Sequence, residues 1–204
     1  MRWLLPDDFD KCADIPSVLA CVLDHSMEMT ATHLGNVQLM NWRSGCLEIG
    51  AQRGFETEFL NFFRRVRLDH GTACGRVLRS RDTIVIDDVL TDVEFSPFRD
   101  LACRAGFRAV QSTPLVSRSG ALVGVVSNHF SQVRRPSDMQ LGGLKEAAGL
   151  AADAIIRILA RGEDGRLQKS IELLERSYRA IDTADRLLSR PPHARPDQGR
   201  AAAE

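Results

Sequence analysis

Residues 109–130, AVQSTPLVSRSGALVGVVSNHF, contain the clearest secondary-structure signal in the chain. Two runs rich in β-branched and apolar residues, 109–116 and 122–130, flank a polar connection at Ser119-Gly120. Runs of this length and composition favour strands, and a short connection containing Gly favours a hairpin. The segment therefore predicts two adjacent antiparallel strands.

Weaker signals on the N-terminal side of this hairpin predict further strands and short helices. Residues 37–42 alternate in polarity and meet residues 46–52 through Ser44-Gly45, which predicts a second hairpin. The β-branched segment 83–86 predicts another strand. Short helices are expected over 56–65, from the N-cap Thr72 to about residue 80, and from Ser96-Pro97 to a stop at Gly106.

Two longer helices are expected at the ends of this region. Pro16 suits the first turn of a helix whose apolar residues fall on one face, whereas residues 1 to about 14 are expected to be loosely attached. Ser137 and Gln140 form a capping-box pattern before a helix that runs to about residue 160. The order predicts an α+β fold, in which helices collect to one side of an antiparallel sheet and the two long helices lie near each other.

Composition excludes several classes of function. The 204 residues carry 27 Lys plus Arg and 27 Asp plus Glu, and this zero net charge gives no bulk attraction to nucleic acid or anionic membranes. No apolar run approaches the roughly 20 residues of a membrane helix, and no secretory leader is apparent. The five cysteines are odd in number and lack a CxxC pair, so neither disulfides nor a metal site is expected. We expect a cytoplasmic protein with reduced thiols.

Beyond Gly162, apolar residues recur at alternating steps of three and four, as in a short coiled coil. We therefore divide the chain into an N-terminal segment (1–15), a globular domain (16–160), a coiled-coil-like helix (161–189) and a disordered tail (190–204). The residues expected to form the seam of a homodimer, and to couple it to the domain, are Leu167, Ile171, Leu174, Tyr178 and Ile181.

Six ordered segments resemble the pattern of bacterial GAF domains. They are LGNVQL (34–39), AQRGF (51–55), DHGTACGRVL (69–78), IVIDDV (84–89), SPFRDLACRAGFRAVQSTPL (96–115) and GVVSNHF (124–130). The resemblance covers about residues 16–160. It implies a sheet with the terminal helices on one face and, on the other, a pocket roofed by loops and short helices. It also implies a regulatory role and dimerisation through the terminal helices.

The resemblance does not identify the ligand or cofactor. Asn128, Phe130 and Asp138 match the signature of cyclic-nucleotide-binding members, but His129 stands in place of its Lys and Met139 in place of its final Glu. No cysteine lies in a bilin-attachment motif. His129 is the one candidate haem ligand, although a strand histidine is more often half-buried and hydrogen-bonded.

Strand alternation indicates which residues would face the pocket. Gln111 and Thr113 share one face of their strand, and Ser127 and His129 share one face of the next. A three-residue connection after Arg118 would pair Thr113 with Ser127 and Gln111 with His129, so four polar side chains would converge. A two-residue connection would place Asn128 opposite Gln111 instead. Phe95 and Phe98 are expected on the roof, as ligand contacts or as core packing.

Cys74 is a further candidate because the first turn of a helix favours a thiolate. Its G-x-x-C-G context resembles the free methionine sulfoxide reductases, GAF enzymes that use cysteines. However, Arg64 stands where that family has another Cys, and Val110 where it has an acidic residue. The alternatives for Cys74 are a thiol sensor, with Cys103 as a neighbour, and an inert half-buried residue.

The prediction that follows is a non-catalytic sensory module. A small ligand or partner would bind the pocket, and the terminal helices would relay its presence to a separate signalling protein. The alternatives are a ligand-free interaction or dimerisation module and a redox sensor or enzyme.

Overall fold

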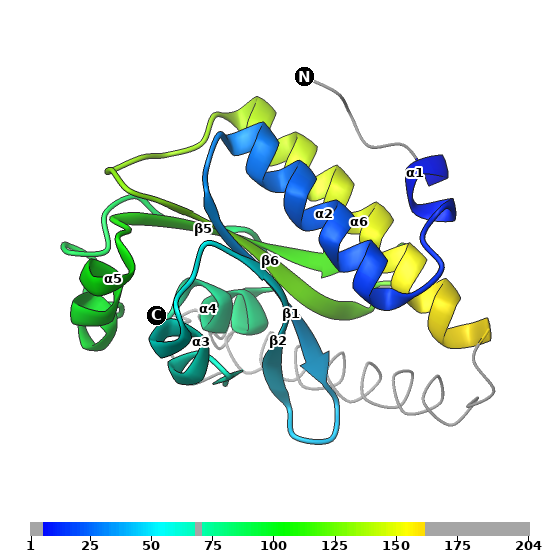
Figure 1. Cartoon of the computed structure of the whole chain (residues 1–204), viewed down its shortest axis with the longest axis horizontal. Coiled ribbons are helices and arrows are strands. Elements are labelled where there is room, and N and C mark those ends of the chain that lie inside the picture. Colours follow the sequence, from blue (N-terminus) through cyan, green and yellow to red (C-terminus); the bar gives the residue numbers. More distant parts are fainter. Residues whose placement is uncertain (1–5, 68–70, 162–204) are drawn as a thin grey trace, which may run out of the picture.

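The computed structural model describes residues 6–67 and 71–161, which form an antiparallel sheet covered on both faces (Figure 1). Within these residues the sheet has six strands in the order β3-β2-β1-β6-β5-β4. The strands are β1 (Leu34–Asn41), β2 (Cys46–Arg53), β3 (Arg65–Val66), β4 (Ile84–Ile86), β5 (Ala109–Val116) and β6 (Leu122–Phe130). Both predicted hairpins, β1–β2 and β5–β6, are confirmed.

The helices lie on both faces of the sheet. They are α1 (Pro6–Asp10), α2 (Ile15–Thr30), α3 (Thr57–Phe62), α4 (Ala73–Ser80), the 3₁₀ turn η1 (Ser96–Phe98), α5 (Arg99–Ala105) and α6 (Asp138–Arg161). Of these, α4 and α6 begin at the predicted caps Thr72 and Ser137. Thr72 accepts a hydrogen bond from the Gly75 amide at 3.2 Å, and Gln140 Oε1 accepts one from the Ser137 amide at 3.0 Å. These side chains satisfy amides that a helix N-terminus would otherwise leave unpaired.

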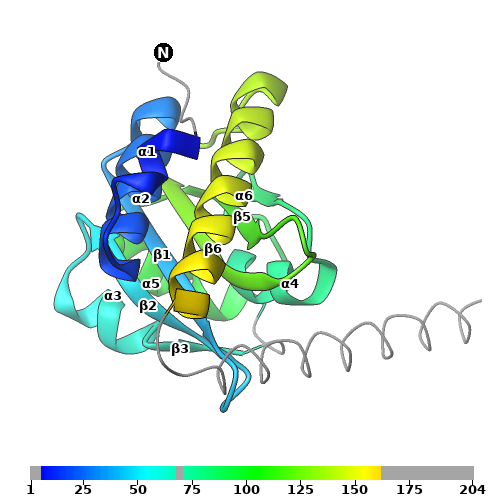
Figure 2. The ribbon, with the colours of Figure 1, turned by 90° about the vertical axis from the view of Figure 1, so that its right-hand side faces the viewer.

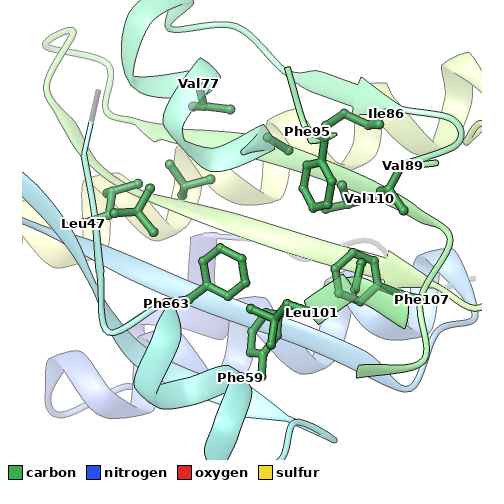
Figure 3. Close-up of a cluster of buried hydrophobic side chains, with 14 of the residues drawn as sticks. Leu47, Phe59, Phe63, Val77, Ile86, Val89, Phe95, Leu101, Phe107 and Val110 are labelled. Carbon is green, nitrogen blue, oxygen red and sulfur yellow. The ribbon is translucent and has the colours of Figure 1, made fainter. Parts of the chain in front are cut away.

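The two long helices, α2 and α6, lie side by side on one face of the sheet, as predicted (Figures 1 and 2). Their apolar stripes pack on Val37, Leu115 and Val126. On the other face lie α3, α4 and residues 87–107, which we call the roof. Figure 3 shows Phe59, Phe63, Phe95 and Phe107 gathered between the roof and the strands. None of the helices in this part of the chain has the length and apolar character needed to cross a bilayer.

The predicted helix at 56–65 is shorter than expected. Helix α3 ends at Phe62, and the following Arg65–Val66 pairs with β2 as a two-residue strand. Val66 lies opposite Leu47, and both side chains are fully buried. Burial of this β-branched residue against the sheet therefore prevails over the helical pattern, because tertiary packing commonly overrides a weak local preference.

The predicted three-residue register of the β5–β6 hairpin is wrong. The turn lies one residue earlier than expected, closed by the Ser117 amide donating to the Ala121 carbonyl at 2.9 Å. An irregularity beside Val116 then adds a residue on β6, because Val116 pairs with Leu122 and Leu115 with Gly124. The result is the alternative pairing, with Gln111 opposite Asn128 and Ser112 opposite Ser127.

The expectation of a loosely attached N-terminal segment is also wrong for its described residues. Phe9 of α1 is 1% exposed and belongs to the core between the sheet, α2 and α6. Asp10 forms an ion pair with Arg157 of α6 at 2.8 Å. An aromatic ring inserted into the core therefore anchors α1.

Replacing Phe9 by Ala should lower the free energy of unfolding by about 3 kcal/mol, because it removes a buried ring and leaves a cavity. Equilibrium denaturation in urea measures this change. Val93 is 82% exposed, so Val93→Ala is the matched control and should change stability by less than about 0.5 kcal/mol. Equal effects for the two variants would contradict the anchoring role of Phe9.

Candidate functional site

A small, partly open cavity of about 20 Å³ lies between the sheet and the roof. The sheet contributes polar side chains from its central strands, which are Asn36 and Gln38 of β1, Ser112 of β5, and Ser127 and His129 of β6. The roof contributes mainly apolar groups. The roof residues in the lining are Phe59, Ala73, Cys74, Phe95 and Phe107. Phe63 directly after α3 and Thr72 directly before α4 also line the cavity, and β5 adds Val110.

The structure brings four of the seven predicted pocket residues to this cavity: Ser127, His129, Phe95 and Cys74. Gln111 and Thr113 do not line it, because the observed register places Ser112 opposite Ser127 and turns both of their side chains to the opposite face. There Gln111 donates a hydrogen bond to Thr113. Phe98 packs beside the cavity, with its ring centroid 5.6 Å from that of Phe95.

Asn36, Gln38 and Ser112 line the cavity but were missed by the sequence reasoning. Asn36 and Gln38 occupy alternate positions of β1, where Asn36 lies opposite Ser127 and Gln38 opposite Val125 of β6. Amide side chains two residues apart in an otherwise apolar strand were the available signal. Without knowledge that β1 and β6 pair, that signal could not be joined to His129.

Three polar atoms in the cavity wall have no hydrogen-bond partner among the described residues. They are Asn36 Oδ1, Gln38 Oε1 and His129 Nδ1. Their residues are 3%, 1% and 6% exposed. Most buried polar groups in proteins are paired, and an unpaired one costs about 1–3 kcal/mol. The residues that carry these three atoms all line this cavity, so unpaired polar groups gather around it.

His129 lies among aromatic rings, which keep it neutral. Its ring centroid is 4.7 Å from that of Phe107 and 4.9 Å from that of Phe55, both edge-on. Burial lowers the pKa of His129 to about 3, since the charged imidazolium would lose its hydration. At neutral pH this histidine therefore has one ring nitrogen that donates and one that accepts a hydrogen bond, and it carries no charge.

Charged residues fasten the outside of the roof. The Arg76 guanidinium on α4 forms a two-pronged ion pair with Asp92, in which Nη1 donates to Oδ2 at 2.8 Å. Asp92 Oδ1 also accepts the Phe95 amide at 2.9 Å, which joins the pair to an aromatic residue of the cavity wall. The hydrogen bonds from Arg76 lower the pKa of Asp92, so this carboxylate stays ionised. The pair therefore holds α4 against the segment that carries Phe95.

The family assignment rests on a comparison of the sequence with models of known families. A family model described as "GAF domain" matches residues 12–156 of the chain. The chain belongs to the GAF domain family. Its sheet, with α2 and α6 on one face and a roofed cavity on the other, agrees with the fold expected from the sequence resemblance.

Individual proteins similar to this GAF domain include a sensor and an enzyme. A methyl sulfide methyltransferase-associated sensor of Methanosarcina acetivorans is 23% identical over 72% of the chain, although the match spans only 15% of that protein. The solved structure of a GAF domain/HD domain protein from Geobacter sulfurreducens has a TM-score of 0.63 at 19% identity, covering 74% of this chain and 99% of that one. Free methionine-R-sulfoxide reductase from Neisseria meningitidis has a TM-score of 0.60 at 19% identity, covering 74% and 83%. At these identities the solved structures establish the fold alone.

The surroundings of Cys74 in the GAF domain weigh against the thiolate that the first turn of a helix would favour. It is half-buried in the cavity wall, and its sulfur lies 3.4 Å from Thr72 Oγ1. Burial raises the pKa of its thiol, and this effect prevails over the hydrogen bonds from Thr72 and the Gly75 amide that favour the thiolate. Cys103 is exposed on α5, and all five cysteines are free. The structure therefore favours an inert Cys74 over a redox-active one.

Asp92→Asn should loosen the roof and make Cys74 more reactive toward iodoacetamide. The substitution removes the charge from a partly buried ion pair, which costs about 1 kcal/mol after allowance for its exposure. Alkylation of Cys74 at neutral pH, followed by mass spectrometry, should accelerate about fivefold. The exposed Cys103 serves as the internal reference for reagent activity.

The matched control is Asp87→Asn, which removes one partner of the exposed Asp87–Arg135 ion pair. This variant should leave the alkylation rate of Cys74 unchanged. If Asp92→Asn also leaves that rate unchanged, the Arg76–Asp92 pair does not fasten the roof.

Proposed function

We propose that this GAF domain is a non-catalytic sensory module that binds a small molecule in the cavity under its roof. The observation that carries the proposal is the convergence of Asn36 Oδ1, Gln38 Oε1 and His129 Nδ1 on one cavity without partners. An apolar core of the same shape would be more stable, because each unpaired buried group costs free energy. Their placement is therefore best explained by a bound ligand that pairs with them.

Binding would require the roof to move. A cavity of about 20 Å³ accommodates roughly one water molecule, so any larger ligand must displace roof side chains. Because the Arg76–Asp92 pair and the Phe95 amide share the Asp92 carboxylate, displacement of Phe95 would strain that pair. Ligand binding would thus favour one of two roof arrangements, as a sensor requires.

The route from the cavity to the terminal helices would run through β6. Ser127 and His129 face the cavity, while Asn128 between them faces α2. Asn128 Nδ2 donates to the Ser26 carbonyl at 2.7 Å and to Thr30 Oγ1 at 2.6 Å, and its Oδ1 accepts from Ser26 Oγ at 3.0 Å. A shift of β6 under a ligand would therefore pull on the C-terminal turns of α2.

The output of the module would lie beyond α6. We propose that Leu167, Ile171, Leu174, Tyr178 and Ile181, which lie outside the described residues, form the seam of a homodimer in the cytoplasm. The tail predicted at 190–204 also lies outside them. A change in the α2–α6 pair would alter that seam, and a separate signalling protein would respond to it.

Native mass spectrometry of the freshly purified full chain, paired with a denatured spectrum, tests for the ligand. We expect extra mass of a small organic molecule that is present in the native spectrum and lost on denaturation. A variant with Asn36→Leu and Gln38→Met should lose that mass, since two of the partners are removed. Retention of the mass in this folded variant would mean that the ligand binds elsewhere.

A protein-interaction module without a ligand is the second candidate, favoured by the small size of the cavity. In this case the cavity would hold a water molecule, and the helices would be the working surface. A bare dimer in the native spectrum would support this candidate over the sensor.

Charged substitutions at the proposed seam should dissociate the dimer. Ile171→Glu combined with Leu174→Glu should convert the dimer to a monomer, because two unpaired carboxylates per chain would be buried at the interface. Sedimentation velocity measures the change. The control is Lys169→Glu with Arg176→Glu, which introduces the same carboxylates on the outer face of the predicted helix. A dimer that survives the first pair of changes would exclude this seam.

A further inference from the structure

We propose that the part of the ligand buried in the cavity is uncharged and donates a hydrogen bond to Gln38. This inference rests on the proposed function, since it names the class of molecule for the same site. It follows from the absence of charge in the cavity wall and from the fixed orientation of one amide.

The lining contains polar groups but no charged ones. None of the described residues that line the cavity is Lys, Arg, Asp or Glu. His129 does not substitute for them, because burial keeps it neutral at physiological pH. Transfer of an ionised carboxylate or ammonium group into such a site is strongly unfavourable without a buried counter-charge. The site therefore selects against charged ligands.

Gln38 specifies the hydrogen-bond polarity of the ligand. Its Nε2 donates to the Phe63 carbonyl at 3.4 Å, and a carbonyl can only accept. The amide nitrogen must therefore face Phe63, which leaves Oε1 as the unpaired atom in the cavity wall. The ligand must offer an N–H or O–H at this position. Asn36 and His129 are less restrictive, because amide rotation and imidazole tautomers let each donate or accept.

The hydroxyl groups of the wall already take part in hydrogen bonds within the protein. Ser112 Oγ lies 2.7 Å from Ser127 Oγ, and Thr72 Oγ1 accepts the Gly75 amide. Recognition therefore depends mainly on Gln38, Asn36 and His129. The remaining wall is largely aromatic and includes Phe59 and Phe95, which suits a flat apolar portion of the ligand.

Four probes of nearly equal shape separate charge from hydrogen bonding. Benzamide is neutral and donates through its amide nitrogen, whereas acetophenone is neutral and has a methyl group there. Benzoate is an anion, and benzamidine is a cation at neutral pH. Each is titrated at millimolar concentration into the uniformly ¹⁵N-labelled full chain, and ¹H–¹⁵N spectra locate and quantify binding.

We expect benzamide to shift the side-chain amide signals of Asn36 and Gln38 and the backbone signals of β1 and β6. Acetophenone should bind there at least about tenfold more weakly, because Gln38 Oε1 would stay unpaired. Benzoate and benzamidinium should bind about a hundredfold more weakly or not at all.

Gln38→Met tests the assigned acceptor with a side chain of similar length. This variant should bind benzamide at least about tenfold more weakly while keeping the native pattern of backbone signals. The matched control is Gln111→Met, because Gln111 is equally buried with an unpaired Oε1 but lies on the opposite face of the sheet. Its affinity for benzamide should equal that of the unmodified chain. The four-probe comparison does not depend on either variant.

The outcomes distinguish the ligand class from the function. Binding of benzoate or benzamidinium in the cavity as tightly as benzamide would overturn the uncharged class and leave the sensory proposal standing. Equal affinity for acetophenone, or undiminished benzamide binding by a folded Gln38→Met chain, would overturn the donor requirement. If none of the four probes perturbs the cavity signals, this inference is overturned, whereas the proposed function is decided separately by the native mass spectra.

Discussion

The alternation of side chains along β6 is the constraint on which the rest of the molecule depends. Consecutive residues of this strand face opposite sides of a sheet that is covered on both sides. Ser127 and His129 reach the cavity, whereas Asn128 holds α2 through three hydrogen bonds. A slip of one residue would bury Asn128 under the roof and turn His129 toward the helices. One register therefore sets both the polarity of the cavity and the attachment of the helix.

The domain keeps polarity and charge in separate places. Amide, hydroxyl and imidazole groups face the cavity, while the Arg76–Asp92 and Arg108–Asp88 pairs lie at the margin of the roof. Charged groups retain some hydration there, so the pairing does not carry the full cost of burial. The interior can consequently be polar without being ionised, and its histidine stays neutral because it is buried among aromatic rings.

Much of the fold could be predicted from local signals, and the site only in part. The β5–β6 hairpin, the Thr72 cap and the Ser137–Gln140 capping box each depend on a few neighbouring residues, so the sequence contains them directly. Gln111 was misplaced because the turn position and the irregularity at Val116 together decide the face of every residue in the strand. Asn36 and Gln38 were missed because pairing between β1 and β6 joins segments about 90 residues apart, which no local pattern reveals. Phe9 looked unattached for the same reason, since its partners belong to α2 and α6.

The start of α4 rests on a contact that leaves no room for a side chain. A Cβ atom at Gly71 would lie 2.1 Å from the Glu94 carbonyl oxygen, so even a methyl group would force these two stretches of backbone apart. Thr72 and Cys74 follow directly on one side, and Phe95 adjoins Glu94 on the other. A methyl group at Gly71 would therefore push the start of α4 away from the segment that carries Phe95. Position 71 can therefore accept only glycine unless the backbone at residue 94 moves away, which makes it one of the least variable positions expected in this domain.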